Sequence, residues 1–250
     1  MTYSFFIDID MDSDWGVATG AGVVGGIDSV IERDRRGQPV LRGTVLTGIL
    51  RENAQVAAIA LDEGDPSGPW SSLCARIFGS AEAARLITFT DAVAADPVET
   101  SELVSVSIDS QTQTAKDDHL RFFERAGAAR LCAQVVCCTL TTGGARVAWT
   151  DAQLADVELL LAVACDIVEA VGSDKSVGDG SCRMRLRTAG HPQGWPWNAL
   201  ESASRTPTIP TIHAIPAAKI TDSPNIDETG FFTAPLSIDL LSPVISYEAP

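Results

Sequence analysis

An aspartate that follows a pair of glycines and precedes a basic run is the first feature of this chain that could do chemistry. Glycines let the backbone approach a ligand closely, and arginines beside free backbone amides favour an anion. A carboxylate in such a place can take a proton or bind a divalent ion, whereas an exposed loop acid or an Asx-turn is the ordinary alternative. The arginines could equally form a solvated turn. The residues are Gly25, Gly26, Asp28, Arg33, Arg35 and Arg36.

Two further places combine cations with backbone amides. Arg42 and Arg51 bracket the start of a predicted helix that contains Gly43 and Thr44. Helix N-termini favour phosphate, although Arg51 could instead pair with Glu52 or Asp62 on the surface. The second place is "GSDKSVGDGSCRMRLR", which lacks the residue order of a nucleotide-binding P-loop and so excludes an NTPase of that type, while phosphate contact through its glycines stays open. Its candidate residues are Lys175, Ser176, Gly178, Gly180 and Arg183.

The overall composition describes an acidic globular protein. The 250 residues are 45% hydrophobic and carry 33 acidic against 18 basic side chains, a formal charge of −15. This balance argues against coating nucleic acid by bulk electrostatics, yet the arginines are clustered rather than scattered. No apolar run is long enough to span a bilayer and the first residues do not resemble a signal peptide, so we expect a cytoplasmic protein.

The cysteines and histidines do not form a metal-binding pattern. The six cysteines include no Cys-x-x-Cys pair and stand in apolar segments, and the three histidines do not fall at ligand spacing from them. We therefore expect buried free thiols and no zinc site.

Periodicity places these residues on alternating strands and helices. Residues 5–11 alternate as a half-buried strand, residues 16–43 form a long loop, and residues 44–61 have the apolar stripe of a helix. A short helix is expected over 71–78, and a strand ends at Asp91. The clearest helix is expected over 151–171, beginning with a capping box of Thr150 and Gln153, ending at Gly172, and followed by a strand over 182–187.

Between these elements, residues 99–134 are polar and predict an extended, hairpin-like excursion. Residues 103–109 alternate, and residues 130–140 return to the core as a strand. Phe122 and Phe123 are expected at the tip of the excursion, where they could stack on bases or pack on the core. Strand, helix, strands, helix, strand predicts an α+β fold: a ferredoxin-like (RRM-like) βαββαβ core with glycine-rich loops and a thumb-like insertion.

The C-terminal part changes in composition. Residues 1–190 form the expected domain, residues 191–230 a proline-rich connector, and residues 231–250 either a last strand of the first sheet or the start of a second unit.

Four ordered blocks resemble one known family, the RAMP superfamily (repeat-associated mysterious proteins), and most closely the backbone subunit of type III CRISPR effector complexes. The blocks are "GGIDSVIERDRRGQPVLRGTVLTGILRE", "ARIFGS…ARLITFTDA", "VSIDSQTQTAKDDHLRFFERAGAARLCAQV" and "VGSDKSVGDGSCRMRL", within residues 7–186. The family's helix-entry pattern matches Pro39, Gly43, Leu46, Gly48 and Arg51, and its glycine-rich loop matches Gly172, Gly178 and Gly180.

The resemblance implies a subunit that binds a guide RNA and cleaves complementary target RNA in antiviral defence. In this family an aspartate after the first strand is catalytic, and the matching residue is Asp28. Cleavage in the family depends on a divalent metal ion, such as Mg²⁺ or Mn²⁺, and leaves a cyclic phosphate. Asp28 would hold the ion, and Arg42 or Lys116 would neutralise the charge on phosphorus. Implied partners are the guide RNA, the target RNA, other RAMP subunits and the large polymerase-like subunit.

Two other functions stay open. One is a guide-RNA-binding structural subunit that performs no chemistry, and the other is an acidic interaction module outside RNA biology. Salt dependence of RNA binding separates the last of these, because a phosphate reader binds more weakly as salt rises.

Overall fold

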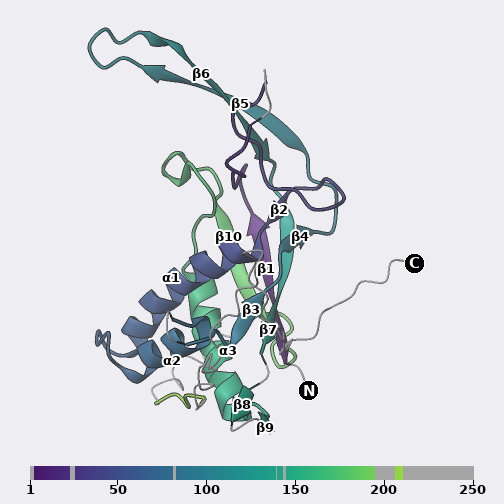
Figure 1. Cartoon of the computed structure of the whole chain (residues 1–250), viewed down its shortest axis with the longest axis vertical. Coiled ribbons are helices and arrows are strands. Elements are labelled where there is room, and N and C mark those ends of the chain that lie inside the picture. The colour runs from purple at the N-terminus through teal and green to yellow at the C-terminus, as the bar shows by residue number, and fades with distance from the viewer. Residues whose placement is uncertain are drawn as a thin grey trace, which may run out of the picture.

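The computed structural model describes residues 3–22, 26–80, 83–138, 140–142, 145–194 and 206–210. The expected tail at residues 231–250 and most of the connector lie outside these ranges. Helices and a sheet form the lower part of the molecule in Figure 1, and a long hairpin projects from its upper end.

The main sheet has the strand order β10-β1-β7-β4-β2, with β3 also paired to β7. Every pairing in this sheet is antiparallel. Its strands are β1 (Ser4–Met11), β2 (Val40–Leu41), β3 (Ile87–Phe89), β4 (Ala92–Ala94), β7 (Arg130–Cys137) and β10 (Cys182–Arg187). The fold is therefore the mixed α+β class that the sequence predicts, and β1 and β10 lie where expected.

Alternation along β1 decides which face of the sheet is covered. Phe5, Ile7, Ile9 and Met11 are buried, because successive side chains of a strand point to opposite faces. The helices α1 (Gly43–Leu61), α2 (Pro69–Phe78) and α3 (Asp151–Asp166) share one apolar core with these side chains. All three helices lie to one side of the sheet in Figure 1.

The start of α3 agrees with the sequence and its end does not. Thr150 and Gln153 form both hydrogen bonds of the expected capping box. The helix ends at Asp166, not at Gly172, because the next residues leave the helix to pair with the strand entry. The Val171 N–H donates to Gly180 O at 2.9 Å, and the Cys182 N–H donates to Glu169 O at 2.9 Å.

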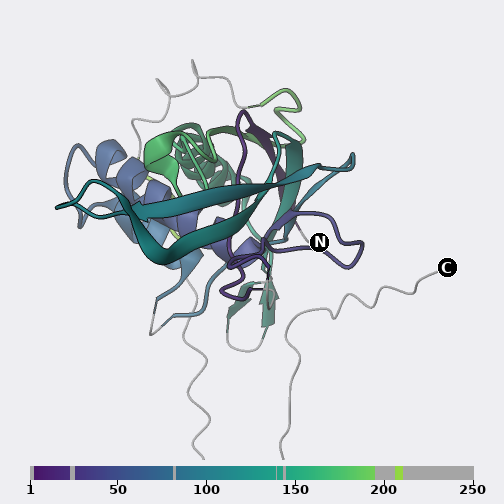
Figure 2. The same ribbon diagram turned by 90° about the horizontal axis from the view of Figure 1, so that it is seen from above.

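The excursion is a two-stranded hairpin made of β5 (Thr100–Ile108) and β6 (Ala115–Ala126). Its tip is the turn 109–114, so Phe122 and Phe123 were wrongly expected there; they pair with Val104 and Leu103 in the half nearer the sheet. Figures 1 and 2 both show the hairpin leaning toward the side on which the helices lie. A second, short hairpin is formed by β8 (Leu140–Thr142) and β9 (Ala145–Val147).

The six cysteines are free thiols, as the sequence predicts, and four of them are buried. Burial raises the pKa of Cys74 and of Cys182 to about 11. In the described part of the chain, no helix has both the length and the apolar character needed to cross a membrane.

Candidate nucleic-acid interface

Asp28 lies in a segment, 26–33, that we call the aspartate loop. The loop runs along the outer side of β6, where the Asp28 N–H donates to Phe122 O at 2.9 Å and the Phe122 N–H donates to Asp28 Oδ2 at 2.7 Å. Two backbone hydrogen bonds also join Ser29 to the strand. The Ser29 N–H donates to Phe122 O, and the Glu124 N–H donates to Ser29 O. Asp28 is exposed but fixed in place, and Gly26 beside it is exposed as well. Gly25 lies outside the described residues.

Glu124 is the acid that attaches the rest of this loop to the hairpin. Its Oε2 accepts the Ile31 N–H at 3.1 Å, and its other carboxylate oxygen pairs with Arg33. Arg33 also donates to Gly37 O at 2.6 Å. The arginine predicted to contact phosphate therefore already has a carboxylate partner within the chain.

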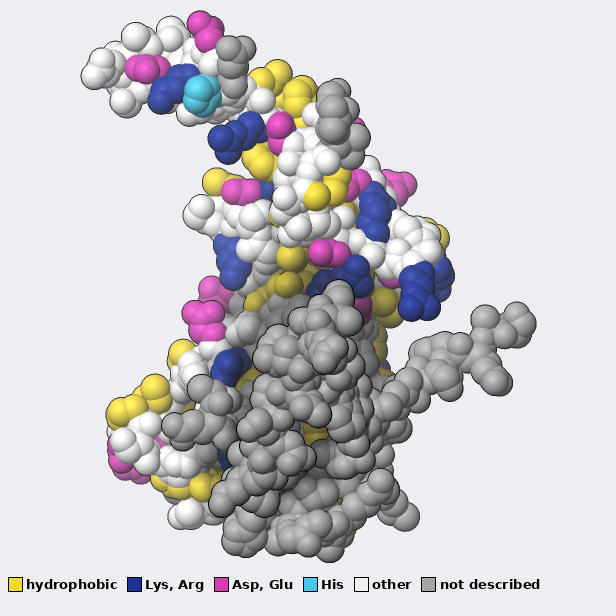
Figure 3. Space-filling model, in the orientation of Figure 1, with side chains coloured by type: hydrophobic (Ala, Val, Ile, Leu, Met, Phe, Trp, Pro, Cys, Tyr) yellow, Lys and Arg dark blue, Asp and Glu magenta, His cyan; other side chains and the backbone are white. Residues whose placement is uncertain are grey.

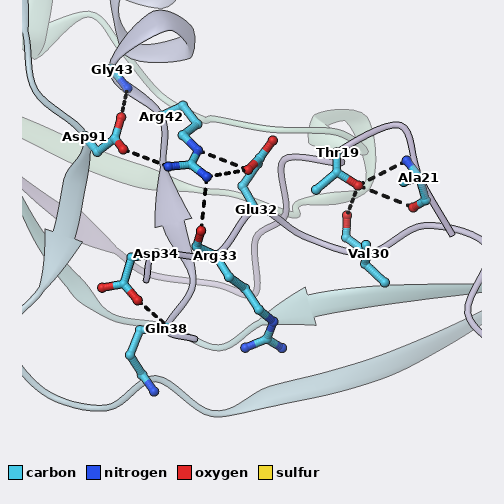
Figure 4. A network of polar contacts seen from close by, with 10 residues as sticks. All are labelled: Thr19, Ala21, Val30, Glu32, Arg33, Asp34, Gln38, Arg42, Gly43 and Asp91. Atoms are coloured by element: carbon cyan, nitrogen blue, oxygen red, sulfur yellow. Dashed lines mark hydrogen bonds and ion pairs between the residues drawn. The ribbon is translucent and has the colours of Figure 1, made fainter. Parts of the chain in front are cut away.

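Arg42 is held between two carboxylates at the entrance to α1. It donates to Glu32 Oε2 at 2.9 Å and to Asp91 Oδ2 at 2.9 Å, and Figure 4 shows the three side chains in one network. The Arg42 Nη2 also reaches Arg33 O at 3.1 Å. The hydrogen bonds to Asp91 and then to Glu32 raise the pKa of the Arg42 guanidinium.

The N-terminus of α1 is partly occupied by the same acid. The Gly43 N–H donates to Asp91 Oδ1 at 2.7 Å, which gives this helix end a protein carboxylate in the position that a phosphate would take. Thr44 in the first turn is exposed. Arg51 lies two turns further along the helix and donates to Gly79 O, so it forms the surface pair neither with Glu52 nor with Asp62.

The second glycine segment, 172–181, is called the glycine loop. Lys175, Ser176 and Gly178 are exposed in or beside a single 3-10 turn, Lys175–Val177, whereas Gly180 is buried. Residues 12–16 run beside this loop: the Gly180 N–H donates to Asp14 O at 2.7 Å and the Ser13 hydroxyl donates to Gly178 O at 2.9 Å.

The strand that follows the glycine loop carries its arginines on the face away from the helices. Arg183 donates to both carboxylate oxygens of Asp12, at 2.9 and 3.1 Å, and Arg187 does the same to Asp8. The Asp12 hydrogen bond raises the pKa of Arg183. Figure 3 shows acidic and basic side chains interleaved over the upper half of the visible face, rather than a surface of one sign.

Lys116 is the second residue of β6, near the tip of the hairpin, and is exposed. Asp28 contacts the same strand at Phe122, nearer the sheet. The two residues that the resemblance offers for charge neutralisation thus lie on different elements. Arg42 lies at the entrance to α1, and Lys116 lies toward the tip of the hairpin.

Several residues at the base of the hairpin carry contacts that the sequence did not suggest. Trp15 is buried, and its indole Nε1 donates to Gly127 O at 3.1 Å. Arg125 is buried and pairs with Asp174 and Asp179 of the glycine loop. A buried arginine inside a polar segment has no local pattern that reveals it, because its partners stand about fifty residues away in the chain.

The aspartate loop carries two carboxylates, Asp28 and Glu32, and Glu32 already pairs with Arg42. Within the ranges that the structure describes, no three His, Cys, Asp or Glu side chains come together as a possible metal site. Mg²⁺ is commonly held by one or two carboxylates together with substrate phosphates and water. Asp28 fits that role as a single ligand beside bound RNA, and not as part of a complete protein site.

Comparisons with known proteins place the chain in a family. Solved structures described as the type III-B Cmr-beta complex in its apo state and bound to cognate target RNA each contain a chain of similar fold, with a TM-score of 0.52 and 11% identity, covering 74% of this chain and 97% of that chain. No curated protein matches the sequence. The model of the RAMP superfamily matches residues 13–183, and the chain belongs to the RAMP superfamily.

Proposed function

We propose that this chain is a guide-RNA-binding subunit of a type III CRISPR effector complex. One observation carries the proposal: both glycine-bearing segments meet the base of the same strand, β6. The aspartate loop bonds to Phe122 and Glu124, and the glycine loop pairs with Arg125. Two loops held against one hairpin would bring backbone N–H groups and cations to a single ribose-phosphate strand. Similarity in fold to chains of the Cmr-beta complexes supports it.

The strand order supports a ferredoxin-like core within this subunit. If β3 and β4 are taken as one interrupted strand, the sheet reads fourth, first, third, second strand, with α1 and α3 as the two crossover helices. We infer a βαββαβ unit into which α2 and the hairpin are inserted. The expected partners are a guide RNA, a complementary target RNA, further RAMP subunits and the large polymerase-like subunit, and the cytoplasm is the expected location.

The exposed surface of the hairpin fits a nucleic-acid role. Val104, Val106 and Leu120 are large apolar side chains that remain exposed. Val106 of β5 pairs with Leu120 of β6, and Val104 is two residues before Val106. Lys116 and Arg121 on β6 are exposed as well. Apolar side chains beside cations suit contact with bases next to phosphates, because bases offer an apolar face and phosphates a charge.

The proposed chemistry is cleavage of target RNA at Asp28. The 2′-oxygen forms a bond to the adjacent phosphorus, the bond from phosphorus to the 5′-oxygen breaks, and a 2′,3′-cyclic phosphate remains. Asp28 accepts the 2′-hydroxyl proton, and the 5′-oxygen receives one from water. A bound Mg²⁺ or Mn²⁺ would neutralise charge on the phosphate oxygens. The two bonds to Phe122 keep the carboxylate in one position, which such in-line geometry requires.

The decisive experiment compares three assembled complexes. Asp28→Asn keeps an oxygen that can accept the Phe122 N–H but removes the negative charge, Asp28→Ala removes both, and Asp96→Asn is a control at an exposed acid. We expect guide and target binding in all three, and loss of the cut at this subunit, by at least about 10²-fold, in the two Asp28 variants. Unchanged cutting by Asp28→Asn would remove Asp28 from the chemistry.

A second function is favoured by the same contact. Since Asp28 fastens its loop to β6, it can serve structure alone, and the chain would then be a non-catalytic guide-RNA-binding subunit. In that case a complex carrying Asp28→Asn cuts target RNA as the wild-type complex does, whereas Asp28→Ala weakens assembly.

RNA binding itself is tested by filter binding of the whole chain at low and moderate salt. Lys175→Met and Lys116→Met should weaken binding and reduce its salt dependence, because each removes an exposed cation. Binding that does not respond to salt would favour an interaction module outside RNA biology.

A further inference from the structure

Arg125 is the most deeply buried cation among the described residues, and it joins two regions that the chain holds far apart in sequence. Its side chain is 5% exposed. The Arg125 Nε donates to Asp179 Oδ2 at 3.2 Å, and Nη2 donates to Asp174 Oδ2. A planar guanidinium can bind two carboxylates at once, which an ammonium group cannot do with the same geometry. Both carboxylates belong to the glycine loop, while Arg125 belongs to the hairpin.

The glycine loop needs such an anchor because part of it is strained. Asp174 adopts a left-handed conformation, with φ 59° and ψ 26°. This conformation is less favourable than the right-handed one for a residue with a β-carbon. The ion pair with Arg125 offsets that cost and selects one arrangement of the loop, which carries Lys175 and Ser176 immediately after Asp174.

Arg125 is also fixed from the hairpin side, so it cannot simply follow the loop. Its guanidinium lies over the Phe123 ring, 5.6 Å from the ring centre, and its Nη1 donates to Glu124 O at 3.3 Å. Gly16 lies beneath it, where a β-carbon would meet Nη1 at 3.1 Å. Trp15 and Ala126 exchange two backbone hydrogen bonds of 2.8 Å next to this contact.

We propose that Arg125 is a positioning residue that couples the glycine loop to the hairpin, so that the two act on RNA as one clamp of fixed spacing. The RNA part of this inference rests on the proposed function. Arg125 is buried and therefore touches no RNA itself. Contacts made by Lys175 in the loop and by Leu120 on the hairpin strengthen each other only while Arg125 holds both regions in register.

The first test needs no RNA. Hydrogen–deuterium exchange is compared among wild type, Arg125→Met, Asp174→Asn and the control Arg130→Met, whose side chain is 92% exposed and pairs with Asp10 at 3.3 Å. We expect the amides of Ser173 and Gly180 to exchange on the order of 10-fold faster in Arg125→Met and Asp174→Asn, since each variant removes one charge of the ion pair and asparagine leaves only a weaker hydrogen bond. The amides of Trp15 and Ala126 should also exchange faster in Asp174→Asn, although the substitution lies in the loop.

Faster exchange confined to the loop in Asp174→Asn would overturn the coupling. This variant also covers the case in which Arg125→Met fails to fold, because the Asp174 side chain is half exposed and asparagine tolerates the same backbone conformation.

The second test measures RNA affinity in a double-mutant cycle. Lys175→Met and Leu120→Ser are made singly and together, in the wild-type background and in Asp174→Asn. In the wild-type background we expect the two effects to differ from additivity by on the order of 5-fold in Kd. In Asp174→Asn they should become additive.

The outcomes separate the two proposals. Persisting non-additivity in Asp174→Asn would overturn the clamp. An absence of RNA binding by the wild-type chain would overturn the proposed function, while the exchange experiment would still decide whether the loop and the hairpin are coupled.

Discussion

The helix-covered sheet and the hairpin use similar residues in opposite ways. In the sheet, apolar side chains of β1, β7 and β10 are buried against the helices, and Arg185 and Arg187 on the open face pair with aspartates of β1. In the hairpin, Leu103, Val104, Val106, Ile108 and Leu120 remain exposed. All nine residues of β5 are exposed, although apolar and polar residues alternate along this strand as they do along β1.

This difference indicates which region buries its apolar side chains without a partner molecule. A two-stranded hairpin is marginally stable alone, and an exposed apolar face usually marks a binding surface. The contacts of Arg33, Glu124 and Arg125 attach the base of the hairpin to the loops, so the free part begins only beyond them. The sheet should therefore govern folding, and the hairpin should govern binding.

The largest expected contrast separates the two regions by stability. Leu160 of α3 is fully buried, and Leu160→Ala should lower the free energy of unfolding by about 4 kcal/mol, since it removes apolar contacts and leaves a cavity. Val106→Ser on the hairpin should change it by less than about 0.5 kcal/mol, because the side chain is already exposed. Urea unfolding of both variants measures the difference. A comparable loss in Val106→Ser would mean that the hairpin belongs to the folding unit.

Within the glycine loop, two neighbouring glycines sharpen the same contrast. Both have positive φ, but a β-carbon on Gly180 would meet Val171 O at 1.8 Å, whereas one on Gly178 meets nothing within 4 Å. We expect Gly180→Ala to cost about 3 kcal/mol through steric overlap and backbone strain, and Gly178→Ala to cost about 1 kcal/mol through strain alone. Thermal unfolding of the two variants measures both. Equal losses would show that the strand entry at residue 180 is not closely packed.

A smaller effect is expected at the start of α3, within the sheet region. Thr150→Ala removes the side-chain acceptor of the Gln153 N–H, a bond of 3.2 Å, and should lower the free energy of unfolding by about 1 kcal/mol. Thr150→Ser keeps the acceptor and serves as the control. RNA binding should not change in either variant. Weaker binding by Thr150→Ala, measured where the protein is fully folded, would connect this helix to the interface.

The elements that sequence patterns predicted best are those stabilised by local rules. The strand at 182–187 and the capping box of Thr150 and Gln153 are confirmed, because alternation and capping depend on residues close together in the chain. The end of α3 was predicted too late, since its last residues pair with Ser181 and Cys182, which no local pattern shows. Hydrogen bonds to this distant segment ended the helix, although the helical spacing of apolar residues continues to Val171.

The candidate site shows the same difference between local patterns and long-range contacts. Its glycine segments could be found from composition, but the partners of the arginines could not, because Arg42 with Asp91 and Arg125 with Asp174 are long-range pairs. The number of arginines in a sequence window therefore overstates how many of them are available to bind an anion outside the chain. Whether Asp28 cuts RNA stays a prediction.

The smallest effect concerns the open face of the sheet, and it depends on pH. The hydrogen bonds from Arg187 lower the pKa of the Asp8 carboxyl, which accepts two of them at 2.8 and 3.0 Å. A pKa lowered on folding adds stability above the ordinary aspartate pKa of about 3.9, and this stability is lost as the pH falls through the lowered value.

Asp8→Asn should therefore lower the free energy of unfolding at pH 7 by at most about 0.5 kcal/mol, because the pair is partly exposed and screened by solvent. Below the lowered pKa the wild-type side chain is protonated too, so the two proteins should become equally stable. Urea unfolding at pH 7 and at a series of lower pH values, with Asp96→Asn as the exposed control, follows this convergence. A difference that stays constant with pH would mean that Asp8 stabilises the sheet by packing and not by its charge.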